Sequence, residues 1–159
     1  KMEKFTFFWK GHFSQWFPSK FVIDGISYLC AEQYMMARKA TFFGDSKTLN
    51  KIMITTSPKE QKALGRTVKP FDINKWNAIV KEIVFKGNLA KFRQNPKLKD
   101  KLLDTIGTTL VEASPLDKIW GIGLSAKDEK ALNRDTWQGT NWLGEILTNV
   151  REELLSEIK

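Results

Sequence analysis

The sequence is poor in two residues on which many enzymes depend. Cysteine and histidine each occur once among 159 residues, as Cys30 and His12. This excludes an internal disulfide framework and a cysteine-based zinc site. Serine or cysteine catalysis through a histidine would depend on His12 alone, and we expect that residue at the surface or at the rim of a pocket. The sequence predicts no cofactor, and a metal would need carboxylates almost alone.

Long hydrophobic runs are also missing. No apolar run approaches the ~20 residues that cross a bilayer, and the stretch from Lys1 to Thr6 lacks the apolar core of a signal peptide. Apolar residues make up 42% and aromatic residues 12%, which is typical of a globular protein. We expect one domain over residues 1–159, monomeric, without membrane contact, in the cytoplasm of a bacterium or of a phage-infected host.

Acidic residues are scarce in the middle of the chain. Between Lys47 and Lys101 there are 14 basic residues and 4 acidic ones, whereas the rest of the chain has 12 basic and 14 acidic ones. The whole surplus of +8 therefore lies in the middle third. Such a surplus favours a polyanionic partner, first a nucleic acid and second a phosphorylated metabolite. A solvated lysine-rich surface is the alternative.

Local signals predict an α+β fold that is mostly helical, with a few short strands. Asp24-Gly25 between two triplets rich in strand-favouring residues predicts a two-residue hairpin turn. Ser57-Pro58-Lys59-Glu60 is a capping box with proline at the first helical position. Strands are expected at 5–9, 21–23, 26–28 and 108–111, helices at 31–43, 45–54, 58–65, 72–94, 96–105 and 141–158, and an irregular loop at 114–140. Gly87 is a potential weak point in the long helix.

The predicted helix at 31–43 has no convincing polar face. Glu32 and Lys39 fall within about 20° of each other around the helix and about 10 Å apart along it. Their stripe is shared with methionines and a phenylalanine, so we expect both to be at least partly buried. Buried ionisable groups often mark a working site, although a structural ion pair is the alternative.

A second cluster follows the predicted strand at 108–111. Asp117 precedes Trp120, Gly121 and Gly123, a pattern that lets backbone approach a ligand under an aromatic ring. The glycines fit neither common nucleotide-binding loop. Asn141 stands at the start of the last helix, where its simplest role is that of an N-cap.

Three groups of cations are further candidates. Lys91 lies on the apolar side of the long helix, from which it either extends to solvent or enters a pocket to meet phosphate. Lys75, Lys86 and Arg93 share another stripe, within about 20° of one another, that would suit a phosphate backbone. Arg66 could serve either surface.

The motifs in order resemble the NADAR family, also called YbiA-like. They run from about residue 5 to Arg151, and together they are specific although each is modest. They are Phe13-Ser14-Gln15-Trp16-Phe17, Ala31-Glu32-Gln33-Tyr34-Met35 with Lys39, Leu64-Gly65-Arg66, Trp76, Lys91-Phe92, Leu110-Val111-Glu112, Asp117-x-x-Trp120-Gly121-x-Gly123 and Gly139-x-Asn141-x-Leu143-Gly144.

The resemblance implies an N-glycosidase that acts on a ribose joined through nitrogen to a base or a base-like amine. Two substrate classes belong to the family: ADP-ribose on guanine, and the phosphoribosylamino-pyrimidine intermediates of riboflavin synthesis. The middle charge favours the first, in DNA before RNA or as a free ADP-ribosyl nucleotide. The long stretch 124–138 departs from compact members of the family, which weakens the direct transfer of substrate identity. A binding module without turnover is the competing class.

The resemblance also implies roles for the candidate residues. Glu32 would stabilise charge at ribose C1 or relay a proton, and Lys39 would be the nucleophile or would position Glu32. Asp117 would hold ribose hydroxyls or assist proton transfer, and Trp120 would stack on the leaving base. The expected substrate-binding residues are Trp120, Gly121, Gly123, Asn141, Arg66 and Lys91.

Overall fold

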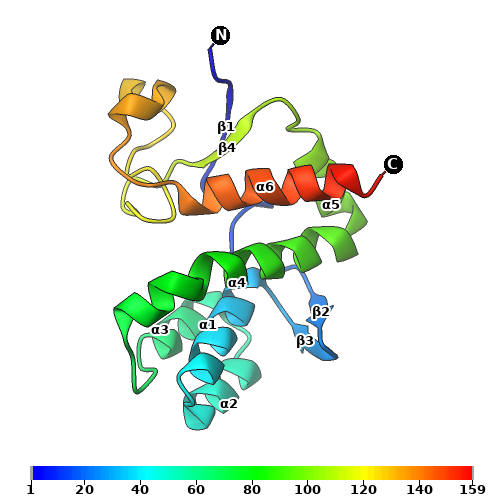
Figure 1. Cartoon of the computed structure of the whole chain (residues 1–159), viewed down its shortest axis with the longest axis vertical. Coiled ribbons are helices and arrows are strands. Elements are labelled where there is room, and N and C mark those ends of the chain that lie inside the picture. Colours follow the sequence, from blue (N-terminus) through cyan, green and yellow to red (C-terminus); the bar gives the residue numbers. More distant parts are fainter. Residues whose placement is uncertain (1, 159) are drawn as a thin grey trace. The chain divides into compact units, whose positions relative to one another are not determined.

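The computed structural model describes residues 2–158 and divides the chain into two compact units. The continuous unit is residues 15–95, and the split unit combines the residues up to 14 with those from 96 onward. Six α-helices and four short strands occur among residues 2–158, so the prediction of a mostly helical α+β fold is confirmed (Figure 1). That the whole chain forms one domain stays a prediction.

The continuous unit begins with a hairpin. Strands β2 (Phe21–Ile23) and β3 (Ile26–Tyr28) pair in antiparallel fashion with Phe21 opposite Tyr28. Asp24 and Gly25 both have positive φ, 52° and 81°, as a tight hairpin turn of this hand requires. The helices that follow are α1 (Ala31–Phe42), α2 (Ser46–Ile54), α3 (Pro58–Gly65) and α4 (Ile73–Gln94).

Side-chain caps fix the starts of three of these helices. The Asp45 carboxylate accepts from the Thr48 amide, and the Asp72 carboxylate accepts from the amides of Asn74 and Lys75. The Ser57 hydroxyl accepts from the Glu60 amide at 3.3 Å, as the capping box predicts. Because these signals are local in the sequence, the predicted starts of α2, α3 and α4 agree with the structure to within one residue.

Helix α1 is the centre of the continuous unit and packs against α2, α3 and α4 (Figure 1). Residues 31–37 are all buried, which confirms that the helix has no polar face at its start. Two glycines permit the close approach: a Cβ on Gly65 would lie 2.0 Å from Met36 Sδ, and one on Gly87 would lie 2.7 Å from Tyr34 Cδ2. Helix α4 runs unbroken through Gly87, which makes room for Tyr34, so the predicted weak point does not interrupt the helix.

In the split unit, β1 (Phe5–Phe8) and β4 (Thr109–Glu112) form a parallel pair with Phe5 opposite Thr109. The helices of this unit are α5 (Pro96–Leu103) and α6 (Trp142–Ser156), and α6 packs against β4. The loop between β4 and α6 contains two short 3-10 turns, η1 (Glu129–Leu132) and η2 (Arg134–Thr136). Trp137 of this loop packs with Phe5 on Val111 and Ile122.

Gly144 sets the approach of α6 to β4. A Cβ at this position would lie 2.1 Å from the Leu110 carbonyl oxygen, a backbone atom that cannot move independently. We expect Gly144→Ala to lower the free energy of unfolding by roughly 2–4 kcal/mol despite the better helix propensity of alanine. Urea unfolding followed by circular dichroism measures this change. Asn149→Ala on an exposed position of α6 is the control, and equal midpoints for the two variants would contradict the close approach.

Across residues 2–158, none of the helices combines the length and the apolar character needed to cross a membrane.

Candidate active site

Glu32 lies in the first turn of α1, and its side chain is almost completely buried, with 4% of its surface exposed. Its amide donates to the Gln15 carbonyl at 2.9 Å, which ties the start of α1 to the segment before the hairpin. The Trp16 side chain, the residue after Gln15, donates a hydrogen bond to the Glu32 carboxylate. One short segment therefore fixes both the backbone and the carboxylate of Glu32.

Three cations surround this carboxylate electrostatically. Lys62 lowers the pKa of Glu32 most, followed by Lys39 and then Arg66. The hydrogen bond from Trp16 lowers it by an amount between those of Lys62 and Lys39. Lys62 and Arg66 are four residues apart and therefore share one side of α3, at its end. Burial outweighs all of these effects and raises the pKa of Glu32 to about 7. A carboxyl group with that pKa can both take up and release a proton near neutral pH.

Lys39 lies two turns further along α1 and is half-buried. Its Nζ lies 4.5 Å from the centre of the Phe71 ring and 6.0 Å from that of Trp76. Burial lowers the pKa of Lys39, the charge of Glu32 raises it, and Arg66 lowers it again. The amine thus lies against two aromatic rings, in surroundings whose net effect is to lower its pKa from the ordinary value.

Lys91 on α4 is buried completely, with 0% of its surface exposed, so the alternative that it extends to solvent is wrong. Its Nζ lies 4.9 Å from the centre of the Phe92 ring and 6.0 Å from that of Phe17. Burial lowers the pKa of Lys91 to about 7, and the nearby Cys30 thiol partly opposes this. Cys30 itself donates to the Gln61 side-chain oxygen at 3.3 Å, and burial raises its pKa.

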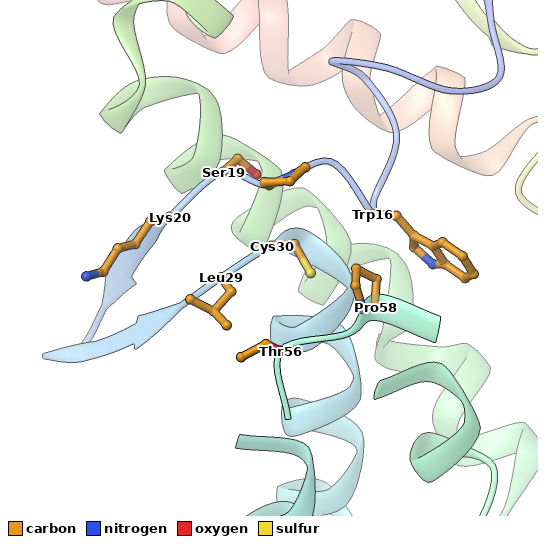
Figure 2. Close-up of a pocket in the computed structure, with 8 residues that line it drawn as sticks. Trp16, Ser19, Lys20, Leu29, Cys30, Thr56 and Pro58 are labelled. Atoms are coloured by element: carbon orange, nitrogen blue, oxygen red, sulfur yellow. The ribbon is translucent and has the colours of Figure 1, made fainter. Parts of the chain in front are cut away.

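A cleft of about 390 Å³ opens beside the start of α1 in the continuous unit (Figure 2). Trp16 and Cys30 face it from two sides, and Figure 2 shows Pro58 of α3 between them. Trp16 therefore connects the cleft to the Glu32 carboxylate through its hydrogen bond. The lining residues are Trp16, Pro18, Ser19, Lys20, Leu29, Cys30, Thr56 and Pro58.

The second group of candidates lies in the split unit, on the turn after β4. One carboxylate oxygen of Asp117 accepts from the amides of Ile119 at 2.9 Å and Trp120 at 2.8 Å, so this side chain builds the turn that carries Trp120. The Gly123 amide closes the turn on the Asp117 carbonyl at 3.0 Å, with Gly123 at φ +71°. The Trp120 ring meets Trp142 edge to face at 5.5 Å.

Gly121 and Asn141 hold the same turn to β4. A Cβ on Gly121 would lie 2.8 Å from the Glu112 carbonyl oxygen. Asn141 is fully buried with a positive φ of 53°, and its side chain makes no cap for α6, so its expected N-cap role is wrong. Its side chain instead accepts from the Glu112 amide at 2.9 Å and donates to the Leu110 carbonyl at 3.0 Å. These bonds make Asn141 a positioning residue for the end of β4.

The structure thus brings Glu32, Lys39 and Arg66 together in the continuous unit, and Asp117, Trp120, Gly121, Gly123 and Asn141 together in the split unit. Lys75, Lys86 and Arg93 are exposed on α4. Sequence reasoning assigned no role to Trp16 or Lys62. The spacing of Lys62 to Arg66 was an available signal, whereas the bond from Trp16 depends on the folded loop. Among residues 2–158 no group of three or more His, Cys, Asp and Glu side chains could hold a metal ion.

Glu32 and Lys91 give the stability of the chain opposite dependences on pH. The pKa of Glu32 is raised to about 7 in the folded state. Its contribution to the free energy of unfolding is therefore full below the pKa of the unfolded chain and is lost as pH rises through 7. The pKa of Lys91 is lowered to about 7 in the folded state. Its contribution to the free energy of unfolding is therefore full above the pKa of the unfolded chain and is lost as pH falls through 7. Each shift corresponds to roughly 3–5 kcal/mol.

Urea unfolding of the wild type and of Lys91→Met between pH 6 and pH 10 tests the second of these dependences. We expect the wild type to gain stability relative to Lys91→Met as pH rises above 7, because only the wild type must bury an ammonium group at low pH. Lys86→Met, which changes an exposed lysine on the same helix, should show no such trend. A pH-independent difference between Lys91→Met and wild type would mean that Lys91 is not desolvated as described.

Comparisons with known proteins identify relatives of this chain. The NADAR domain model matches residues 7–155. The chain is 47% identical over 146 residues to N-glycosidase R617 of Acanthamoeba polyphaga mimivirus, covering 89% of this chain and 86% of that one. It is 38% identical over 113 residues to the chloroplastic riboflavin biosynthesis protein PYRR of Arabidopsis thaliana, covering 69% of this chain and 17% of that one.

The NMR structure of the E. coli protein YbiA matches with a TM-score of 0.80 at 29% sequence identity, covering 99% of this chain and 89% of that one. Together with the relative named as an N-glycosidase, this similarity extends over nearly the whole chain. The chain is an N-glycosyl hydrolase, and it belongs to the NADAR family.

Proposed function

We propose that this N-glycosidase removes ADP-ribose from guanine in a nucleic-acid strand, in DNA in preference to RNA. The observation that carries the proposal is the line of exposed cations on α4. Lys75, Lys86 and Arg93 extend over ~27 Å of helix, a length that spans several phosphates of a nucleic-acid strand. A free nucleotide has too few phosphates to occupy such a line, whereas a polymer can follow all of it.

The chemistry assigned to the continuous unit is cleavage of the bond between ribose C1 and the guanine nitrogen. Positive charge develops at C1 as the bond breaks, and the Glu32 carboxylate stabilises it while accepting a proton from the attacking water. Water oxygen ends on C1 as a hydroxyl, and the proton that Glu32 takes from the water passes to the guanine nitrogen as it leaves. Arg66 binds the phosphates of ADP-ribose, whereas Lys91 is completely buried and is assigned no contact with the substrate.

Lys39 has two possible roles in this proposal. As a nucleophile its neutral amine attacks C1 of the opened ribose, the base departs, and water later hydrolyses the resulting imine to regenerate the lysine. As an electrostatic partner it holds Glu32 ionised, consistent with their opposite effects on each other's pKa. The roles that the resemblance implies for the split unit stay predictions: ribose binding or proton transfer by Asp117, stacking on the leaving base by Trp120, and backbone contacts from Gly121 and Gly123.

A substrate panel tests the proposal. It contains a DNA strand with ADP-ribosylated guanine, the matching RNA strand, free ADP-ribosyl-guanosine and a phosphoribosylamino-pyrimidine, each incubated with wild type and with Glu32→Gln. We expect ADP-ribose to be released fastest from DNA, and its release to be lost in the variant. Release from the free nucleoside at the same kcat/KM as from DNA would contradict a nucleic-acid substrate.

A second candidate is hydrolysis of the phosphoribosylamino-pyrimidine itself. It is favoured by the similarity to the riboflavin biosynthesis protein PYRR, which covers 69% of this chain. Turnover of the phosphoribosylamino-pyrimidine alone in the same panel would assign this function. The cations on α4 would then be a solvated surface that binds no nucleic acid. Binding of the ADP-ribosylated strand without any product would support a binding module instead.

A further inference from the structure

An aromatic surface with exposed rings adjoins Lys39 in the continuous unit. We call it the aromatic ledge and define it as Phe42, Phe43 and Phe71. The ring centres of Phe42 and Phe43 lie 4.9 Å apart and those of Phe43 and Phe71 lie 5.2 Å apart. Phe42 and Phe71 are each 44% exposed. Exposure of two large aromatic rings to water in one patch is unfavourable. The ledge is therefore a surface that favours covering by a flat or apolar ligand.

The ledge is fixed in place by the fold around it. Phe42 and Phe43 end α1, and the segment that carries Phe71 is held to the same region because the Lys69 amide donates to the Asp45 carboxylate at 2.9 Å. Phe71 also covers the Lys39 amine at 4.5 Å. One edge of the ledge is therefore the candidate nucleophile, and the other edge faces solvent at Phe42.

The segments that carry these rings are rich in positive charge. Residues 38–47 and 66–75, the two segments that build the ledge, contain six cations and two carboxylates. Both carboxylates, Asp45 and Asp72, are occupied as helix caps. Cations interleaved with exposed aromatic rings are the pattern by which proteins bind unpaired nucleic acid, with bases on the rings and phosphates on the cations. An apolar peptide would not need this charge, and a second copy of the chain, itself with a net charge of +8, would be repelled by it. The cations are Arg38, Lys39, Lys47, Arg66, Lys69 and Lys75.

We propose that the aromatic ledge stacks an unpaired base beside the modified nucleotide, so that the enzyme takes its nucleic acid as a single strand. The inference deepens the proposed function and rests on it for the nature of the substrate. A duplex keeps its bases stacked on one another and cannot offer a face to Phe42 or Phe71. The ledge thus selects strand state, while the cations on α4 supply affinity that is independent of sequence.

Binding of unmodified oligonucleotides tests the ledge separately from catalysis. Fluorescence anisotropy compares a 12-nucleotide DNA single strand, its blunt duplex and the equivalent RNA strand, and a 2-aminopurine in the single strand reports stacking by quenching. We expect Phe42→Leu, which keeps apolar bulk but loses the ring, to bind the single strand about 10-fold more weakly and to abolish the quenching. Phe71→Leu should behave alike, and Ile54→Ala, at an 82% exposed apolar position, should bind as wild type.

Salt dependence separates stacking from phosphate contacts. Phe42→Leu should keep the wild-type slope of log Kd against log salt concentration, whereas Lys75→Gln should reduce it. Wild-type binding of the duplex as tightly as the single strand, or unchanged binding and quenching in Phe42→Leu, would overturn the ledge. Hydrolysis of free ADP-ribosyl-guanosine by a wild type that binds no strand would overturn it while leaving glycosidic cleavage intact. If the ledge binds the strand but the enzyme hydrolyses no ADP-ribosyl substrate, the proposed function is contradicted and the ledge is not.

Discussion

Replacement of Glu32 by glutamine is expected to lower the rate of glycosidic cleavage at least about 1,000-fold. The amide has the shape of the carboxyl group, but it lacks the negative charge that stabilises the positive charge developing at C1. It also cannot accept a proton from water. Single-turnover release of ADP-ribose from the modified strand measures the effect on the chemical step. KM should change much less than kcat, because glutamine preserves the shape of the site.

The same variant should remain folded, because it removes a buried charge and keeps a group that can accept the hydrogen bond from Trp16. Above pH 7, where wild-type Glu32 is ionised, the free energy of unfolding of Glu32→Gln should equal or exceed that of wild type. Glu82→Gln, at an exposed position on α4, is the matched control for the loss of one negative charge. Near-normal turnover by folded Glu32→Gln would move the role of the carboxylate to another residue.

Replacement of Lys39 by methionine is expected to reduce turnover at least about 100-fold and to abolish covalent trapping of the substrate. Methionine keeps apolar contact with Phe71 and Trp76 but has no amine. Incubation of wild type with the ADP-ribosylated strand and cyanoborohydride would reduce an imine to a stable amine, and peptide mass spectrometry would locate it. The half-buried position of Lys39 gives a substrate access to its amine, which the full burial of Lys91 does not.

Two controls sharpen this prediction. Lys51→Met changes an exposed lysine in α2, outside the candidate site and the ledge, and should retain both turnover and trapping. Lys91→Met should retain trapping if Lys91 contributes only its buried charge. An adduct found on Lys91 in wild type would contradict the assignment of Lys39 as nucleophile. Loss of turnover in Lys39→Met without any adduct in wild type would assign Lys39 to the electrostatic support of Glu32.

The elements that the sequence predicts best are those whose cause lies within a few residues. Asp24-Gly25 determines the hairpin because few other residues adopt two consecutive positive φ angles, and Ser57 determines the start of α3 because it caps the Glu60 amide. Asn141 shows the limit of such local reasoning. It stands at the N-cap position, but its side chain bonds to β4, 30 residues or so earlier in the chain, and no local pattern reports that strand.

In the candidate site, too, features with a local cause were predictable and features that depend on tertiary contacts were not. The lack of a polar face predicts that Glu32 is buried, and the structure confirms it. The depth of Lys91 could not be predicted, because the apolar side of a helix does not reveal whether Phe17 will close over a lysine. The hydrogen bond from Trp16 also depends on tertiary structure, since Trp16 precedes the hairpin and meets Glu32 only after the chain has turned back.

The parallel pairing of β1 with β4 has a consequence for synthesis of the protein. The ribosome makes Phe5–Phe8 about 100 residues before their partners Thr109–Glu112, a delay of roughly 5–20 s. During that interval residues 15–95 emerge without interruption and contain all the helices that surround Glu32. The carboxylate and its cations can therefore assemble on the nascent chain, whereas Phe5–Phe8 has no strand to pair with until Thr109–Glu112 has been made.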